Sequence, residues 1–319
     1  MMLKLTLVGV PLLVAASCAA TIDSSQTSDQ LAAYPSYTGQ YDGFSLVVDE
    51  RFDRFDDTLW RTGDGAVGGE SMCRFQPNGV KVEDGRLILV VQEESVPAGW
   101  SKDHEQEKGP YKYVCGELRT LDDVRFHYGR IEARMKAPDR ETASGYISSL
   151  FTYRFDKDPA SDTPDSIEWE EIDVELEGGR PDKFQANLIY GKDTWEWWRT
   201  RIYGAWEDKI DVGPVDEWRV FAIEWLPDSI SWFVDGQLVK TLHSSDIDCD
   251  PECTPPQEKP TPIPNNPTTI FMNFWIPVDE VQDYFGGNKE RNQYPMTAEY
   301  DWFRYYKWDG PDASDSSPK

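Results

Sequence analysis

Carboxylic residues recur at every second position of one short segment, which runs from Trp169 to Leu176 with the sequence WEEIDVEL. Because side chains alternate between the two faces of a β-strand, Glu171, Asp173 and Glu175 would share one face and the aliphatic residues the other. Four residues of strand span about 13 Å, and the two outer Glu side chains each reach about 3.5–4 Å inward. Their carboxyl groups would stand about 5–6 Å apart, close to the spacing of the two acids of a retaining glycosidase.

Three carboxyl groups packed this closely cannot all ionise independently at neutral pH. We expect one Glu to stay protonated and act as an acid while the other stays ionised and acts as a nucleophile. Asp173 would keep Glu171 ionised through a hydrogen bond, and its own charge would keep Glu175 protonated. A solvated acidic face or a cation site would have the same spacing, so catalysis is one of three interpretations at this point.

The composition argues against several other functions. Asp and Glu number 58 against 32 Lys and Arg, so the formal net charge is −26, and such a chain repels nucleic-acid backbones and anionic lipid surfaces. The residues His104, His127 and His243 have no second His or Cys at metal-ligand spacing, which argues against zinc chemistry and histidine triads. With 13 Trp, 15 Tyr and 14 Phe in 319 residues, the chain is globular rather than disordered.

Short strand patterns surround the acidic segment. Alternating or β-branched runs are separated by turn signals such as Asp84-Gly85 and Asp235-Gly236, and no stretch has the pattern of an amphipathic helix. We therefore expect an all-β fold, an antiparallel β-sandwich near the upper size for one domain. The expected strands include residues 86–91, 130–135, 218–225, 230–234 and 237–242.

The acidic segment resembles the catalytic signature of glycoside hydrolase family 16, in the form that has no extra residue before the final Glu. Similarity to the bacterial lichenases of this family continues in order over about residues 45–308, and this order is more specific than any single piece. The resemblance implies a concanavalin-like jelly roll with a substrate cleft on its concave sheet. The matching pieces include residues 73–78, 113–119, 126–136, 145–153, 232–236, 272–275 and 298–302.

Carried over by position, the resemblance implies that Glu171 is the nucleophile, Glu175 the general acid/base and Asp173 a hydrogen-bonding partner that tunes the nucleophile. Catalysis would need no cofactor. Asp301 and the Gly85 carbonyl match a structural calcium site, with oxygen ligands of the type that calcium takes. The positions that match sugar contacts are Trp169, Glu117, Arg119, Asn187, Asn273 and Trp275.

Some positions depart from the lichenase pattern or allow a second interpretation. Ile189 stands where lichenases usually carry a Tyr near the donor sugar, and Glu177 lies in a stretch that replaces the familiar Phe-Leu-Gly after the signature. Trp275 could pack in the core, since Trp is highly buried on average, and Arg119 could be only an ion-pair partner. Loops at residues 94–110, 154–167 and 246–267 are longer than in compact lichenases. The cluster of Trp195, Trp197 and Trp198 has no lichenase counterpart and would be either a sugar platform or internal packing.

The N-terminus predicts export. Residues 1–18 contain Lys4, an apolar run and small residues, the layout of a signal peptide. The run is too short to span a bilayer, and no other apolar stretch is long enough. Its end resembles a lipobox, so we expect lipidation of Cys18, with ordinary cleavage near residues 19–20 as the alternative. We expect a catalytic domain at residues 45–308, preceded by a flexible linker at residues 19–44 and followed by a polar tail at residues 309–319. The protein would be a monomer, and it would be either a cell-surface or periplasmic lipoprotein or a secreted protein.

Four cysteines remain once Cys18 is set aside, and in an oxidising compartment they would form two bridges. Cys249 and Cys253 lie four residues apart and pair most easily with each other, which would leave Cys73 to pair with Cys115. The second bridge would close a loop of about 40 residues and stabilise the fold by roughly 3–4 kcal/mol. Four buried free thiols are the alternative.

Three functions are consistent with these observations. The first is a retaining endo-β-glucanase that binds and cleaves a mixed-linkage or β-1,3-linked glucan. The second is a transglycosylase or a hydrolase of another β-linked polymer, because plant and fungal transglycosylases share the shorter signature. The third is a lectin-like glycan binder without catalysis. A lectin needs neither Glu171 nor Glu175, so the presence of both favours an enzyme.

Overall fold

The computed structural model describes residues 39–65, 71–97, 99–101, 106–157, 167–192, 201–243, 263–285 and 287–310. The expected signal peptide with Cys18, residues 19–38 of the expected linker and residues 311–319 of the expected tail lie outside these ranges. Also outside them are Cys249, Cys253, Trp195, Trp197 and Trp198, so the predictions made for these residues stay predictions.

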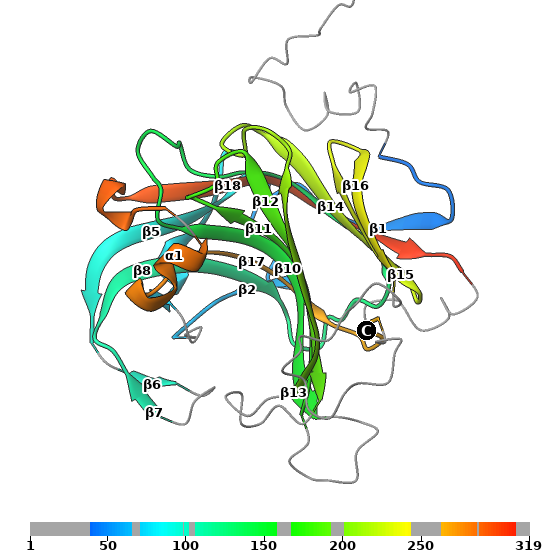
Figure 1. The fold of residues 1–319 in the computed structure, drawn as a ribbon, viewed down its shortest axis with the longest axis horizontal. Coiled ribbons are helices and arrows are strands. Elements are labelled where there is room, and N and C mark those ends of the chain that lie inside the picture. Colours follow the sequence, from blue (N-terminus) through cyan, green and yellow to red (C-terminus); the bar gives the residue numbers. More distant parts are fainter. Residues whose placement is uncertain are drawn as a thin grey trace, which may run out of the picture.

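Two antiparallel β-sheets pack face to face (Figure 1), and we call them the site sheet and the back sheet. Strands β5 and β8 also pair with each other, so a continuous ladder folds over on itself into a jelly-roll-like sandwich. The predicted all-β antiparallel sandwich is confirmed. The site sheet consists, in spatial order, of β13 (Arg201–Asp211), β12 (Lys183–Lys192), β11 (Ile167–Glu177), β10 (Ile147–Lys157), β17 (Thr269–Trp275) and β8 (Tyr111–Thr120), with β2 (Trp60–Thr62) also paired to β8.

The back sheet lies behind the acidic segment, and small elements complete the described chain. Its strands are β5 (Arg86–Val96), β18 (Met296–Trp308), β9 (Gly129–Lys136), β14 (Arg219–Trp225), β15 (Ser229–Val234) and β16 (Gln237–His243), with β1 (Phe44–Glu50) on β18 and β4 (Val80–Glu83) on β5. The small elements are β3 (Cys73–Phe75), the hairpin of β6 (Gly99–Ser101) and β7 (Gln106–Lys108), α1 (Gln282–Phe285), and 3-10 turns at Pro77–Gly79, Asp279–Val281 and Lys289–Arg291. Within the described ranges no helix has the length and apolar character needed to cross a membrane.

The predicted hairpins form where the turn signals placed them. Asp84 and Gly85 join β4 to β5 with φ angles of 53° and 69°, and Asp235 and Gly236 join β15 to β16 with φ angles of 51° and 77°. Two successive residues with positive φ are the geometry of the tight turn that matches the twist of paired strands. The five strands expected from alternation correspond to β5, β9, β14, β15 and β16.

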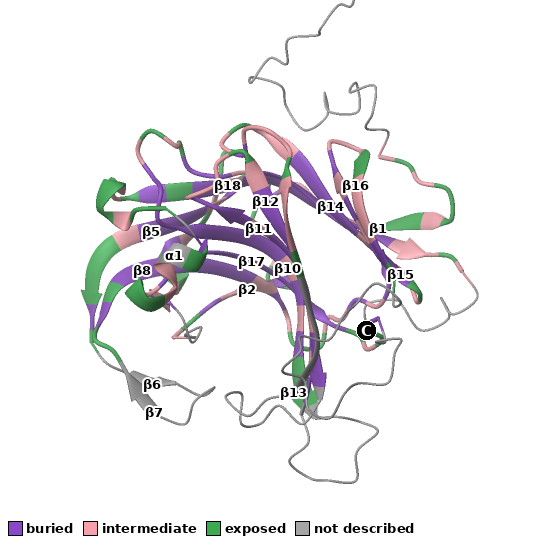
Figure 2. Cartoon of the chain, in the orientation of Figure 1, coloured by how far each residue is buried: buried purple, intermediate pink, exposed green. Residues whose placement is uncertain are grey.

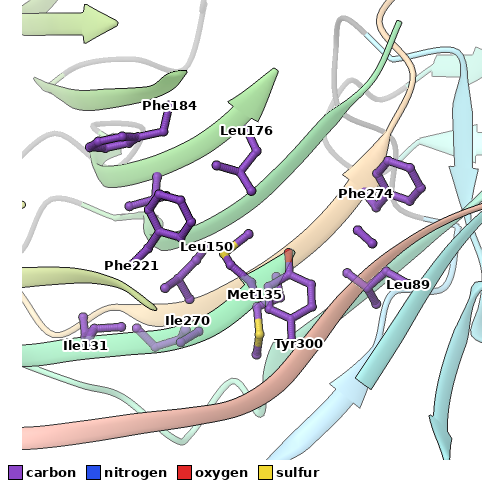
Figure 3. Close-up of a cluster of buried hydrophobic side chains, with 14 of the residues drawn as sticks. Leu89, Ile131, Met135, Leu150, Leu176, Phe184, Phe221, Ile270, Phe274 and Tyr300 are labelled. Carbon is purple, nitrogen blue, oxygen red and sulfur yellow. The ribbon is translucent and has the colours of Figure 1, made fainter. Parts of the chain in front are cut away.

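The core lies between the two sheets and runs through the middle of the sandwich (Figure 2). Along strands such as β11 and β12, alternate side chains enter it, so the alternation in the sequence becomes an apolar inner face and a more polar outer face. Figure 3 shows side chains of the site sheet meeting those of the back sheet, with Leu150, Leu176 and Phe184 from the first and Ile131, Met135, Phe221 and Tyr300 from the second.

Trp232 ties the back sheet to the acidic strand β11. It is fully buried on β15, and its indole Nε1 donates a hydrogen bond of 2.9 Å to the backbone carbonyl of Asp173. A buried carbonyl without a donor is costly. The contact therefore fixes the height of β11 above the core at the residue in the middle of the acidic row.

We expect Trp232→Phe to lower the free energy of unfolding by about 2–4 kcal/mol, because it removes this donor and leaves a cavity. Urea unfolding followed by circular dichroism measures the change. Leu238→Ala on the neighbouring strand β16 is the matched control, since Leu238 is 57% exposed and should change stability by less than about 0.5 kcal/mol. Equal stability of the two variants would contradict the role given to Trp232.

The predicted pairing of Cys73 with Cys115 is confirmed. Both cysteines are fully buried, and the bridge joins positions 42 residues apart. It links β3 to β8, where Cys115 lies two residues before Glu117 on the site sheet. The bridge therefore braces one end of the site sheet, while the second predicted bridge lies outside the described residues.

Candidate active site

Glu171, Asp173 and Glu175 lie on one face of β11, as the alternation predicted, and we call them the carboxyl triad. The apolar residues Ile172 and Val174 point into the core on the opposite face. The triad therefore lies on the outer face of the site sheet, which is the hollow side of the curved sheet in Figure 1. Opposite the triad across β10 are Tyr153, Phe151 and Ser149, and across β12 are Ile189, Asn187 and Gln185, in the order Glu171, Asp173, Glu175.

Not every acidic residue of β11 joins the triad. Glu168 and Glu170 point the other way and are buried beneath the segment that precedes β17. Arg154 pairs with Glu168 at 2.9 Å, and the backbone N–H groups of Asn265 and Asn266 donate to Glu170 at 2.9 and 3.1 Å. These contacts compensate the buried carboxylates and hold the start of β11 in place.

Glu171 is held by donors from its own strand. The indole Nε1 of Trp169 donates a hydrogen bond of 2.7 Å to Glu171 Oε2, and Asp173 shares a second hydrogen bond with Glu171. Burial raises the pKa of Glu171 to about 7, while these two hydrogen bonds act in the opposite direction and favour the ionised form. Ile189, on the other side, has no polar group to offer.

Asp173 carries the proton of the Asp173–Glu171 hydrogen bond. It is only 2% exposed, and burial together with the charges of Glu171 and Glu175 raises its pKa well above the usual range. The shared hydrogen bond raises the pKa of Asp173 and lowers that of Glu171, so Asp173 is the donor. Asn187 is a further hydrogen-bond partner, and Asp173 Oδ2 has no protein partner among the described residues.

Glu175 is the second protonated carboxyl of the site. Gln185 Nε2 donates to Glu175 Oε2 at 2.8 Å. Burial, followed by the charges of Glu171 and Glu177, raises the pKa of Glu175 to about 8. The sequence led us to expect that the charge of Asp173 keeps Glu175 protonated. That expectation stays a prediction; the main causes that raise the pKa of Glu175 are burial and the charges of Glu171 and Glu177, and the charge of Glu175 in turn raises the pKa of Asp173.

Two of the expected sugar-contacting residues, Glu117 and Asn273, line up with Glu175 across the sheet. Glu117 on β8 is opposite Asn273 on β17, and Asn273 is opposite Ser149 on β10, whose hydroxyl donates to Asn273 Oδ1 at 2.5 Å. Arg119 lies 3.9 Å from Glu117 and packs its guanidinium 5.3 Å from the ring centre of Phe271. Arg119 is thus an ion-pair partner on this polar face, and its contact with sugar stays a prediction.

An aromatic stripe crosses the same face, and the sequence analysis did not identify it as part of the site. Its rings touch in succession, with centroid distances of 5.0 Å for Phe151–Phe271, 5.4 Å for Phe271–Tyr153, 6.5 Å for Tyr153–Phe155 and 5.9 Å for Phe155–Trp169. Three of the rings occupy every second position of residues 151–155, the signal that could have placed them on one face. Flat apolar rings beside buried carboxyl groups suit the apolar faces of sugars.

Trp275 lies apart from the stripe. It is opposite Ile147, which is itself opposite Glu177, and its ring meets that of Phe285 on α1 edge-on at 5.5 Å. Trp275 is half-buried and also packs against the core. The structure therefore places it beyond Glu175, at the opposite end of the site from Trp169.

The expected calcium ligands lie on the back sheet, away from the triad. One oxygen of Asp301 already accepts a hydrogen bond of 2.7 Å from Arg134, and the described residues contain no group of three His, Cys, Asp or Glu that could hold a metal. The adjacent guanidinium neutralises the single carboxylate that calcium would need, so Asp301 fits a cation poorly. The calcium site stays a prediction.

The fold is a β-sandwich that carries buried carboxyl groups at alternate positions of one strand, beside a row of aromatic rings. This arrangement is typical of a polysaccharide-cleaving enzyme. Residues 70–303 match the family described as Glycosyl hydrolases family 16. The Beta-glucanase of Bacillus amyloliquefaciens is 31% identical over 262 residues, which cover 81% of this chain and 86% of that protein. The chain belongs to glycoside hydrolase family 16 and is a glycoside hydrolase.

Solved structures agree with this fold. The Bacillus licheniformis beta-glucanase superposes with a TM-score of 0.56 at 25% identity, covering 83% of this chain and 99% of that one. The laminarinase catalytic domain from Thermotoga maritima superposes with a TM-score of 0.62 at 20% identity, covering 83% of this chain and 98% of that one. The second likeness bears on the fold alone.

Proposed function

We propose that the protein is a retaining endo-hydrolase that cleaves a mixed-linkage or β-1,3-linked glucan by double displacement. The observation that carries this proposal is the geometry of the carboxyl triad: Glu171 and Glu175 lie on one face of β11, four residues apart, and each is held by its own hydrogen-bond donor. The donors to Glu171 favour its ionised form, while burial and the charges of Glu171 and Glu177 raise the pKa of Glu175. Two acids on one strand face, in different surroundings, are what a retaining mechanism requires.

In the first step, Glu171 attacks the anomeric carbon while Glu175 gives its proton to the leaving oxygen. The glycosidic bond breaks, and an α-linked glycosyl ester forms on Glu171. Asp173 keeps its proton and donates to Glu171, which orients the attacking carboxylate. In the second step, Glu175 takes a proton from water, the water attacks the same carbon, and the β-configuration returns.

The triad also explains how Glu175 could change from acid to base. The negative charge of Glu171 is one of the causes that raise the pKa of Glu175. When Glu171 becomes a neutral ester, this charge disappears, so the pKa of Glu175 falls at the moment when it must accept a proton. Formation of the glycosyl ester on Glu171 therefore prepares Glu175 to activate the water that hydrolyses this ester.

The assignment to a β-glucan is supported by the β-glucanases of Bacillus amyloliquefaciens and Bacillus licheniformis, to which this chain is similar. The aromatic stripe supports endo action, because a row of rings can hold several successive sugars of a long chain. Ile189 lies directly opposite Glu171 and offers no hydrogen bond, so we expect fewer polar contacts to the sugar at that point than a Tyr would supply.

Transglycosylation and cleavage of another β-linked polymer remain the second candidate, since they need the same triad. We also propose export, which the buried Cys73–Cys115 bridge supports because disulfides persist in oxidising compartments. Lipidation of Cys18 and a monomeric state belong to the same proposal. Release of reducing ends from defined β-glucans and galactans, with and without added acceptor sugars, distinguishes these substrates and outcomes.

The retaining route predicts that the β-anomer of the new reducing end appears first. An inverting enzyme needs about 6.5–9.5 Å between its acids to admit a water, and the strand spacing here provides about 5–6 Å. Proton NMR of the anomeric signals in the first minutes, before mutarotation, makes the measurement. An α-anomer appearing first would show that Glu171 does not attack the sugar.

A further inference from the structure

A fourth carboxyl group follows the triad on the same face of β11. Glu177 is only 2% exposed, although it lies on the outer face of the sheet. Its two oxygens are paired with cations: Lys209 Nζ of β13 lies 3.0 Å from Oε1, and Arg180, in the turn after β11, is paired to Oε2. Burial of a carboxylate together with its cations costs desolvation free energy, so this arrangement indicates a specific role for Glu177.

Lys209 approaches Glu175 from the side. It lies on β13 opposite Gln185 of β12, and Gln185 is opposite Glu175 and donates a hydrogen bond to it. Glu177 follows Glu175 two residues along the strand. The ion pair therefore borders Glu175 in both directions, along the strand and across the sheet.

The pair is also fixed in position by the segment that carries α1. Lys209 Nζ donates to the carbonyl of Tyr284 at 3.2 Å and lies 4.5 Å from the centre of its ring. Arg180 donates to the same carbonyl at 2.9 Å, and the Tyr284 hydroxyl bonds to Glu207 on β13. These contacts hold Lys209 and Arg180 in place, so the distances of both cations from Glu175 are fixed.

We propose that the Glu177–Lys209 ion pair is a positioning pair that balances the charge around Glu175 and keeps its proton available for the leaving group. This inference rests on the proposed role of Glu175 as acid/base. The pair touches neither the reacting atoms nor the nucleophile, and it acts through the electric field at Glu175 and through Gln185.

The two members act on Glu175 in opposite directions. The charge of Glu177 raises the pKa of Glu175 and that of Lys209 lowers it. At a desolvated site such charges are poorly screened, so loss of one member leaves the other uncompensated. Two further groups on the same strand that can carry charge face Glu175, namely Glu171 and Asp173, and Arg180 lies behind Glu177. The neighbouring strands present only uncharged side chains in this row, which are Ser149 of β10, Gln185 of β12 and Asn273 of β17.

The test is the pH dependence of kcat/KM for the full chain on a soluble β-glucan, whose basic limb reports the acid of the free enzyme. The wild type should lose activity above about pH 8, following the pKa of Glu175. Glu177→Gln should move this limb to lower pH and Lys209→Met to higher pH, each by about one unit. The double variant should return close to the wild-type limb, and near pH 6 all three should keep kcat/KM within about fivefold.

Asp208→Asn is the matched control. Asp208 is the neighbour of Lys209 on β13 and also forms an ion pair, with Lys240 at 3.4 Å, but it is opposite Ala186, whose side chain enters the core. This variant should leave the limb unmoved. A structural role of the Glu177–Lys209 pair would lower activity equally at every pH, and limbs that stay in place or move in the same direction in both single variants would overturn the inference.

Failure of the inference and failure of the proposed function give different results. In Glu175→Gln, cleavage of an activated aryl glycoside should lose the basic limb, because its titrating acid is gone. A limb that persists in Glu175→Gln means that Glu175 is not the acid, and the proposed function fails. A limb that disappears in Glu175→Gln, but does not move in the pair variants, refutes the positioning pair alone.

Discussion

Glu171→Ala is expected to lower kcat/KM on β-glucan by at least about four orders of magnitude, as removal of a group that acts in the transition state does. Its described neighbours on the outer face do not replace it, because burial and nearby charges raise the pKa of Asp173 well above its usual range and Ile189 is apolar. The variant should fail equally on polysaccharide and on an activated aryl glycoside, since both need the nucleophile. Initial rates on the two substrates provide the measurement.

Azide distinguishes loss of the nucleophile from general damage. A small anion that enters the space left by the Glu171 carboxylate attacks from the same side and displaces the leaving group once, so the product should be an α-glycosyl azide. Restored turnover with this anomer assigns the nucleophile. Activity close to wild type without azide would remove Glu171 from the mechanism.

The same variant should remain folded, and linkage gives the reason. Burial raises the pKa of Glu171 from an ordinary value of 4.5 to about 7. A carboxyl group whose folded pKa lies above its unfolded one stabilises the fold below about pH 4.5, and this contribution is lost as the pH rises to about 7. Removal of Glu171 should therefore not lower the melting temperature at pH 8. Glu217→Ala, at an exposed position, is the control for an ordinary surface carboxylate.

Alternation in the sequence was enough to predict the strand, its two faces and the members of the carboxyl triad. This worked because side-chain direction in a strand depends only on parity along the chain, and because Ile172 and Val174 mark which face enters the core. The tight turns at residues 84–85 and 235–236 were predictable for a similar reason, since only a few residue types accept positive φ.

The state of each acid was not predictable from the same segment. The proton on Asp173 follows from hydrogen bonds and burial, and the charge that acts on Glu175 comes from Glu171 and Glu177. Lys209 lies 34 residues beyond Glu175, and its approach depends on the register of β11, β12 and β13. Spacing along one strand carries no information about such cross-strand neighbours.

Residue roles carried over by resemblance met the same limit. Trp169 was expected to contact sugar, and the structure shows that its indole N–H is already used to hold Glu171. Asp301 was expected to ligate calcium, and Arg134 occupies one of its oxygens. In both cases a partner from the three-dimensional neighbourhood changes what the side chain has free to offer.

Glu175→Ala should produce a loss that depends on the leaving group. On β-glucan, whose leaving group is a sugar hydroxyl, removal of the acid should lower kcat/KM by about 10³–10⁴-fold. On an aryl glycoside with a strongly acidic phenol the first step needs no proton, so the glycosyl ester on Glu171 should still form at a comparable rate. The second step should then be slow, because no base remains to activate water. A rapid burst of phenol followed by slow turnover is the expected time course.

Azide gives the opposite stereochemistry from the nucleophile variant, and this contrast tests both assignments together. In Glu175→Ala the anion needs no base and attacks the ester on Glu171 from the face that water would use, so the product should be a β-glycosyl azide. The residues opposite Glu175 on the two neighbouring strands are the uncharged Ser149 and Gln185, which do not repel the anion. An α-azide from Glu175→Ala together with a β-azide from Glu171→Ala would mean that the two roles must be exchanged. If Glu175→Ala lowered kcat/KM equally on β-glucan and on the activated glycoside, Glu175 would not be the acid, because loss of a proton donor affects the two leaving groups differently.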